Sequence, residues 1–131
     1  MPANLRRDHD ELRAILSRYF ALMDSPDAGV RAEMPKQRLT FSQTFQRHVR
    51  EARELADKLR LCKDKCAQAN KDMDALLRDY SDHIRSWPPK RIEAELAGYR
   101  NAVRGLGDRL HARLAWEERE LLPLLESRAL R

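Results

Sequence analysis

Long hydrophobic runs, glycine and cysteine are scarce in this chain of 131 residues. No run of about 18 apolar residues occurs, so the sequence predicts no membrane-spanning helix. The N-terminal stretch MPANLRRDHDELR is charged and lacks the apolar core of a signal peptide, so we expect a cytoplasmic protein. With only four glycines, six prolines and two cysteines, the composition excludes collagen-like, disulfide-scaffold and disordered classes.

The two cysteines, Cys62 and Cys66, lie four residues apart and would share one face of a helix. This spacing is not the CxxC spacing of a redox pair or a zinc knuckle. In a cytoplasmic protein we expect both thiols to be reduced, and we interpret them as small core residues.

Charged residues make up 36 % of the chain, and the formal net charge is +5. A basic chain is compatible with nucleic acid or with an acidic partner. Here, however, both signs interleave, as in REARELADKLR, and this pattern is typical of the solvated faces of helices. Aromatic residues make up only 6 % and do not alternate with arginine as base-stacking surfaces do. We therefore expect no nucleic-acid binding.

Apolar residues recur at steps of three and four, which is typical of amphipathic helices. We predict helices over about residues 4–23, 36–62, 70–87 and 97–126, within one domain spanning residues 1–131. Four such helices joined by short loops predict an all-α fold, an up-down-up-down four-helix bundle. The predicted inward stripes are Leu5, His9, Leu12, Leu16, Tyr19 and Met23 in the first helix; Phe41, Phe45, His48, Ala52, Leu55, Leu59, Cys62 and Cys66 in the second; Met73, Leu76, Leu77, Tyr80, Ile84 and Trp87 in the third; and Val103, Leu106, Leu110, Arg113, Glu117, Leu121 and Leu124 in the fourth.

The middle of the chain contains no helix-breaking residue between Lys36 and Trp87. A compact bundle needs a turn there, and the region from Leu59 to Asp72 offers room for it. The most polar candidate is the run of residues 69–72, AlaAsnLysAsp. The alternative is a single helix of about fifty residues, roughly 75 Å long, which would force a swapped homodimer. We favour the turn, and the homodimer stays open.

Polar side chains interrupt three of the apolar stripes: His9, His48, and the pair Arg113 and Glu117. Burying any of them without a partner is costly. In an antiparallel bundle all of these positions fall in the same half of the molecule. We therefore expect them to meet one another, a metal ion or water.

The other two histidines do not fit this arrangement. His83 lies one turn before Trp87, at the opposite end of the predicted bundle, and we interpret it as a capping or surface residue. His111 lies about 200° around the helix from Arg113, so we expect it on the outer, solvated face.

Two motifs resemble hemerythrin-like (HHE cation-binding) domains. The run Asp8-His9-Asp10-Glu11-Leu12 is similar to the opening histidine motif of that family, and residues 116–123, WEERELLP, are similar to its closing segment. His48 lies where the second helix of the family carries a histidine. The resemblance covers roughly residues 5–126. It implies a bundle that holds two irons through histidines and bridging carboxylates and that handles or senses dioxygen, nitric oxide or iron. His9, His48 and Glu117 match its ligand positions.

The departures from the family pattern affect the ligands. Ala52 stands where the second helix should supply a carboxylate, although Glu51 is adjacent, and Arg113 stands where the fourth helix should supply a histidine. The third helix has no histidine near its start. The remaining ligands are too few for two irons. Because a guanidinium stays protonated and cannot ligate a metal, we hypothesise that a buried ion-pair cluster of His9, His48, Arg113 and Glu117 stands in for the metal.

Two functions follow from these residues. In the first, the bundle has lost its di-iron centre, needs no cofactor and acts on another protein as a non-catalytic signalling or regulatory molecule; Trp87, Pro88 and Pro89 form an apolar corner that could serve as its contact. In the alternative, it is a sensor or carrier for dioxygen, nitric oxide or redox state that binds one or two iron ions. The sequence prefers the first. The ligands of the alternative are His9, His48, Glu51, Glu117, Glu118 and Cys66.

An enzyme is not expected from this sequence. It contains no HExxH motif, no glycine-rich phosphate loop and no Ser-His-Asp arrangement.

Overall fold

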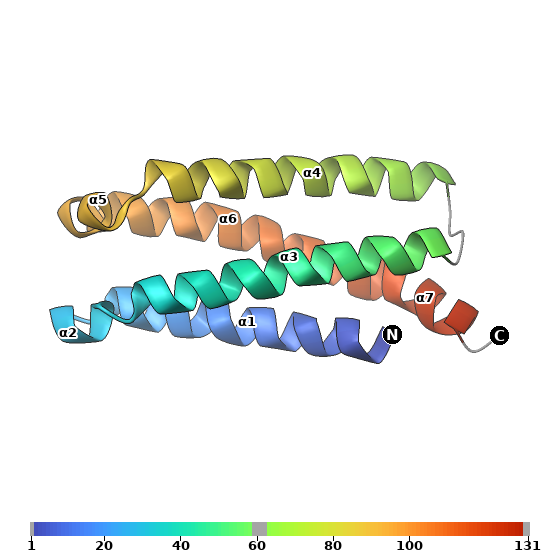
Figure 1. The fold of residues 1–131 in the computed structure, drawn as a ribbon, viewed down its shortest axis with the longest axis horizontal. Helices are drawn as coiled ribbons and strands as arrows, with labels where there is room; N and C mark the ends of the chain where they lie inside the picture. Colours follow the sequence, from blue (N-terminus) through green and yellow to red (C-terminus); the bar gives the residue numbers. More distant parts are fainter. Residues whose placement is uncertain (1, 59–62, 130–131) are drawn as a thin grey trace. The chain divides into compact units, whose positions relative to one another are not determined.

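The computed structural model describes residues 2–129 except residues 59–62. The described residues are almost entirely helical and contain no strand, which confirms the all-α prediction. The up-down-up-down arrangement stays a prediction, since the chain has short helical segments besides the four that were predicted. The segments are α1 (Pro2–Asp24), α2 (Ala28–Arg31), α3 (Met34–Lys58), α4 (Lys63–Ser86), α5 (Pro89–Ala94), α6 (Leu96–Trp116), a π-helical turn η1 (Glu117–Leu121) and α7 (Leu122–Ala129) (Figure 1).

Two compact units make up the chain. Unit 1 comprises Met1–Leu61 and Leu114–Arg131, and unit 2 comprises Cys62–Arg113. Unit 1 therefore combines the N-terminal helices with η1 and α7, whereas unit 2 contains α4, α5 and most of α6.

The core of unit 1 is built on α1, which packs against α3 and α7 (Figure 1). All six residues of its predicted stripe are buried, which confirms the periodicity. The C-terminal segment runs antiparallel to α1, because Arg6 pairs with Glu126 whereas Arg13 pairs with Glu118. The buried stripe consists of Leu5, His9, Leu12, Leu16, Tyr19 and Met23.

Unit 2 is an antiparallel pair of helices, α4 and α6. Asp79 of α4 accepts a hydrogen bond from Arg109 of α6, with a distance of 2.7 Å between Oδ2 and Nη1. Towards the other end, His83 stacks on Tyr99, and their ring centroids lie 5.4 Å apart. The helix α5 begins at Pro89 and connects the pair.

Trp87 is buried, and the predicted apolar corner is wrong in this respect. Its ring packs against Tyr99, with centroids 5.3 Å apart, and the guanidinium carbon of Arg91 lies 3.9 Å from the ring centroid. Only the neighbouring Pro88 and Pro89 are exposed. The indole therefore stabilises the connection between α4 and α6 and offers no apolar contact surface.

The boundary between α3 and α4 differs from the predicted one. The polar run 69–72, the candidate turn, lies inside α4. Ala69 and Met73 are both buried and stand four residues apart, so the polar residues between them occupy the other face of a continuous amphipathic helix. The chain between α3 and α4, residues 59–62, lies outside the described residues, as do Leu59 and the side chains of Cys62 and Cys66.

The C-terminal helix is interrupted by η1 just before Pro123. A proline inside an α-helix cannot donate its backbone hydrogen bond, and its ring clashes with the carbonyl four residues earlier. The chain instead makes a wider turn, in which the N–H of Leu122 donates to the carbonyl of Glu117. This turn contains one more residue than a regular α-helical turn. Leu125, four residues after the buried Leu121, is fully buried, whereas Leu124, the predicted core residue, is 42 % exposed.

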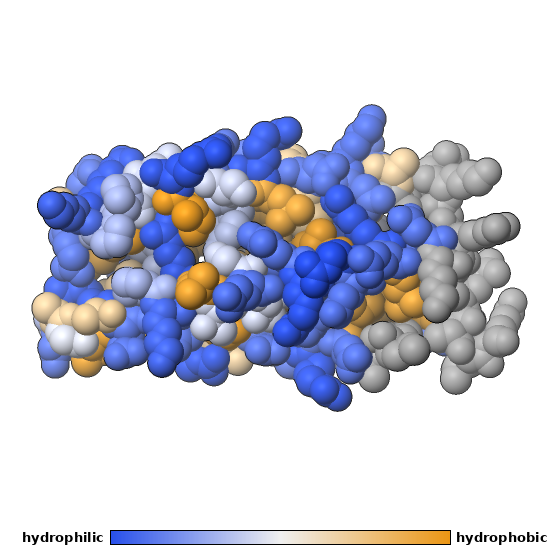
Figure 2. Space-filling model, viewed as in Figure 1, coloured by the Kyte–Doolittle hydropathy of each residue, from blue (hydrophilic) through white to orange (hydrophobic). Residues whose placement is uncertain are grey.

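The surface is mostly polar on the face that Figure 2 shows, with scattered smaller hydrophobic areas. Among the residues that the structure describes, the large exposed hydrophobic ones are Val30, Leu39 and Leu124. Single exposed residues of this kind are ordinary for folded proteins. Among the described residues, no helix combines the length and the apolar character that crossing a membrane requires.

Candidate functional site

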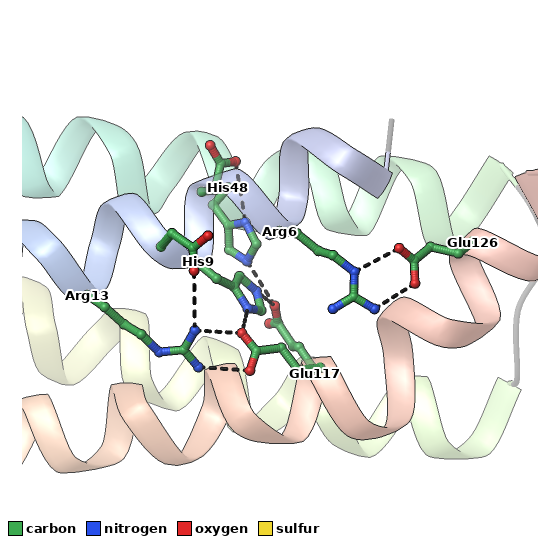
Figure 3. A network of polar contacts seen from close by, with 9 residues as sticks. Arg6, His9, Arg13, His48, Glu117 and Glu126 are labelled. Atoms are coloured by element: carbon green, nitrogen blue, oxygen red, sulfur yellow. Dashed lines mark hydrogen bonds and ion pairs between the residues drawn. The ribbon is translucent and has the colours of Figure 1, made fainter.

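Three buried polar side chains from three different elements meet inside unit 1. His9 of α1 and His48 of α3 are fully buried, and Glu117 of η1 is 1 % exposed. The Nε2 atoms of His9 and His48 lie 2.9 Å and 2.8 Å from the same oxygen, Oε1 of Glu117 (Figure 3). The two imidazole rings are 4.8 Å apart and meet edge to face. The cluster therefore converges on one carboxylate oxygen.

The local sequence explains why these side chains point inward. His9 lies between Leu5 and Leu12 on the buried stripe of α1, with spacings of four and three residues. Glu117 is the first residue of η1, and its backbone carbonyl accepts the wide hydrogen bond of the π turn. Such turns are rare and are frequent at functional sites.

A half-buried carboxylate connects His9 to the surface. Glu118 Oε2 lies 2.8 Å from Nδ1 of His9 and 2.6 Å from Nη1 of Arg13, while Glu118 Oε1 lies 2.9 Å from Nη2 of Arg13. The paired hydrogen bonds from Arg13 and the bond from His9 lower the pKa of Glu118 to about 2, against the opposing effect of partial burial. Glu118 is therefore ionised at neutral pH and accepts from both neighbours.

His9 is positively charged in this arrangement. Each of its ring nitrogens faces a carboxylate oxygen, and an ionised carboxylate can only accept hydrogen bonds. A neutral imidazole has a single N–H, so donation to both Glu117 and Glu118 requires the imidazolium. Burial by itself lowers the pKa of His9, but the hydrogen bonds to Glu117 and Glu118 outweigh burial and raise the pKa above its usual value.

A second carboxylate faces His48, with a different geometry. Asp8 is 4 % exposed, and its Oδ1 accepts a hydrogen bond of 2.8 Å from Nη2 of Arg47. Its Oδ2 lies 3.5 Å from Nδ1 of His48, and both of these buried atoms lack a hydrogen-bond partner. If the proton of His48 is on Nε2, where it donates to Glu117, then Nδ1 carries a lone pair and cannot donate to Asp8. This proton placement accounts for the unsatisfied pair.

The cluster fits a single transition-metal ion. The ligand atoms that His9, His48 and Glu117 offer lie within 4.8 Å of one another. Two imidazoles and one carboxylate are typical of mononuclear non-haem iron sites. An ion on Nε2 of His48 would move the proton to Nδ1, which could then donate to Oδ2 of Asp8 and satisfy both orphaned atoms. Histidines that bind metals commonly donate their other ring N–H to a carboxylate in this way.

The structure brings together three of the four residues of the predicted polar cluster, namely His9, His48 and Glu117. Arg113 belongs to unit 2, where its guanidinium donates to the carbonyl of Ala69 over 3.0 Å, and its pairing with Glu117 stays a prediction.

Other predicted positions have separate roles. Glu118 hydrogen-bonds Nδ1 of His9. Glu51 is half-buried, and its charge acts on Arg47, where it helps to raise the arginine pKa after the larger effect of Asp8. His111 is exposed, as predicted, whereas His83 is half-buried against Tyr99.

Sequence reasoning did not identify Asp8, Arg13 and Arg47 as parts of the site. A signal for Asp8 was present, because it lies three residues after Leu5 and four before Leu12 and thus shares their buried face. The two arginines carried no such signal. Their half-exposed side chains reach the carboxylates from a neighbouring helix, which periodicity along one helix does not describe.

Comparison with family models, with curated proteins and with solved structures gives no match for this chain. The resemblance to hemerythrin-like domains therefore rests on the sequence motifs alone.

Proposed function

We propose that this chain is a hemerythrin-like protein that has lost the family's two-iron centre and binds one transition-metal ion, iron foremost, through His9, His48 and Glu117. The observation that carries this proposal is the buried pair of His48 Nδ1 and Asp8 Oδ2, which face each other at 3.5 Å and make no hydrogen bond. Leaving buried polar atoms unpaired costs about 1–3 kcal/mol for each group. A metal ion on Nε2 removes this cost.

The donor set supports one ion rather than two. Three ligating side chains are enough for one ion with open coordination positions, but a di-iron centre needs several more. An iron ion held by two histidines and a carboxylate can bind a small molecule such as dioxygen or nitric oxide at its open positions. We therefore propose a sensor or carrier and no catalytic activity, with a protein as the downstream partner in the cytoplasm.

We also propose the finer fold, an up-down-up-down four-helix bundle formed by α1, α3, α4 and α6 with its C-terminal extension. In that bundle Arg113, four residues before Glu117, would lie beside the Glu117 carboxylate. It would supply the positive charge that the second iron supplies in the family, since a guanidinium stays protonated.

A second candidate is the metal-free interaction protein that the sequence preferred. The observation in its favour is that Arg13, Arg47 and the His9 imidazolium together balance the negative charges of Asp8, Glu117 and Glu118. A cluster compensated in this way can persist without an ion, and its role would then be to specify the packing of α1, α3 and η1.

Metal analysis separates the two candidates. The chain is purified without chelator, its metal content is measured by mass spectrometry, and an optical spectrum is recorded under air. We expect about one equivalent of iron or another first-row metal, lost in His48→Gln and retained in His111→Gln, which alters an exposed histidine. A wild-type chain free of metal, even after incubation with ferrous iron, would establish the second candidate instead.

A further inference from the structure

We infer that Asp8 and Glu118 are positioning residues for the metal ion, each oriented by a surface arginine; this inference rests on the proposed function. The two carboxylates hold the imidazoles of His48 and His9 so that both Nε2 atoms face Oε1 of Glu117. They act through the histidines and do not themselves touch the ion.

Two chains of contacts with the same order carry this inference, and Figure 3 labels Arg13, His9, His48 and Glu117 among their members. In the first, Arg13 binds Glu118, Glu118 binds Nδ1 of His9, and Nε2 of His9 reaches Glu117. In the second, Arg47 binds Asp8, Asp8 faces Nδ1 of His48, and Nε2 of His48 reaches the same oxygen of Glu117. Each buried imidazole thus lies between a carboxylate on its Nδ1 side and Glu117 on its Nε2 side.

The arginines explain why these carboxylates are not ligands. Glu118 uses Oε1 for Arg13 and Oε2 for both Arg13 and His9. Asp8 uses Oδ1 for Arg47 and presents Oδ2 to His48. Charge-assisted hydrogen bonds of this kind are short and strongly oriented. Every oxygen of the two carboxylates is therefore directed to an arginine or to an Nδ1 atom, which leaves Glu117 as the single carboxylate ligand of the cluster.

The two chains of contacts differ in one respect that makes the role of Asp8 observable. Oε2 of Glu118 lies within hydrogen-bond distance of Nδ1 of His9, at 2.8 Å. Oδ2 of Asp8 lies 3.5 Å from Nδ1 of His48, and the two atoms make no hydrogen bond. An imidazole that binds a metal through Nε2 carries its proton on Nδ1 and needs an acceptor there. Metal loading should therefore close the contact between His48 and Asp8 and leave the contact between His9 and Glu118 in place.

The test compares four proteins by competition titration with Zn(II): wild type, Asp8→Asn, Glu118→Gln and Glu54→Gln. The control residue Glu54 lies on α3, the helix that carries His48, and its side chain is exposed. We expect Asp8→Asn and Glu118→Gln to lose roughly 10–100-fold in Zn(II) affinity, the range that is typical when the carboxylate partner of a metal-binding histidine is removed, and Glu54→Gln to match wild type. Circular dichroism verifies that each variant is folded. If Asp8→Asn unfolds, Arg47→Gln takes its place in the test. This variant removes the arginine that holds the Asp8 carboxylate and should also weaken Zn(II) binding.

Ring nitrogen NMR of His48 supplies a readout that a purely structural role for Asp8 would not change. In wild type the proton should be on Nε2 without metal and on Nδ1 with Zn(II). Zn(II) affinities of Asp8→Asn and Glu118→Gln equal to wild type would overturn the positioning role while the proposed function stands. A wild-type protein that binds no Zn(II) and no iron would overturn the proposed function and this inference together.

Discussion

At the scale of single residues, Glu118 links the buried cluster to the solvent. Its carboxylate accepts hydrogen bonds from the surface residue Arg13 and from the buried His9 at the same time. These donors, Arg13 foremost, lower the pKa of Glu118 to about 2 from an ordinary value of 4.5. A carboxylate whose pKa is lower in the folded than in the unfolded chain stabilises the fold only while it is ionised.

We predict that Glu118 contributes to acid unfolding of the metal-free chain. Its contribution to stability should be complete above pH 4.5 and should disappear as the pH falls towards about 2, since the folded form then loses its preference for the ionised carboxylate. Glu118→Gln should flatten the dependence of the unfolding free energy on pH in this window, measured by urea denaturation at a series of pH values. Equal pH dependence in the variant and in wild type would show that Arg13 and His9 do not stabilise this carboxylate.

The three buried members of the cluster could be predicted from sequence because each one interrupts an apolar stripe. His9 and His48 stand where leucine would be expected, and Glu117 follows the same spacing in the last helix. The arrangement around them could not be predicted in the same way. Arg13 and Arg47 reach their partners across helices, and the contacts depend on side-chain conformations that the sequence pattern does not encode.

At the scale of elements, the stripe of α1 was predicted correctly throughout, because a spacing of three and four holds while a helix is regular. In the last helix four predicted residues are buried, namely Val103, Leu110, Glu117 and Leu121, whereas Leu106 and Arg113 are half-buried. After Leu121 a step of three selects the exposed Leu124 and a step of four selects the buried Leu125, so the spacing alone does not decide between them. The π turn η1 lies just before Pro123, and the sequence does not indicate whether a helix kinks, ends or widens at a proline.

We predict that the extra residue of η1 can be removed only together with the proline. Deleting the exposed Glu120 should restore regular helical bonding across η1, but Pro123 would still clash with the preceding turn, at a cost of about 3 kcal/mol. The variant that combines deletion of Glu120 with Pro123→Ala should have a free energy of unfolding within about 1 kcal/mol of wild type, since the inward face of α7 keeps its orientation. Chemical denaturation measures the free energy of unfolding of the deletion variant and of the combined variant.

The control for this prediction is a deletion in a regular part of the helix. Removing the exposed Ala112 rotates every later residue by about 100° and moves Glu117 and Leu121 away from the core. That variant should be far less stable than the combined variant. Similar stability of the two would contradict the structural role assigned to η1.

At the scale of the whole molecule, the pairing of Arg113 with Glu117 is the part of the proposed bundle that a single substitution can test. Arg113 lies at the end of unit 2, and Glu117 follows four residues later in unit 1. The proposed bundle places the guanidinium beside the Glu117 carboxylate, which is 1 % exposed. Removing one partner of a buried ion pair leaves an uncompensated charge and is strongly destabilising.

We predict that Arg113→Leu lowers the free energy of unfolding by about 3–5 kcal/mol. The matched control is Arg109→Leu, which removes a salt bridge to Asp79 between side chains that are 45 % and 47 % exposed. Exposed ion pairs contribute at most about 1 kcal/mol, so the free energy of unfolding of this control should be close to that of wild type. Equal stability of the two variants would show that Arg113 does not pair with Glu117 and would remove the support for the bundle at this point.

The most direct measurement of the central claim is the number of metal ions that one chain binds. Metal-free protein is titrated anaerobically with ferrous iron, and bound iron is measured by equilibrium dialysis for wild type and for Glu117→Gln. We expect saturation at one ion per chain in wild type and a large loss of affinity in the variant, because Glu117 supplies the only carboxylate ligand in the described cluster of His9, His48 and Glu117. Saturation at two ions, or no binding at all, would contradict it.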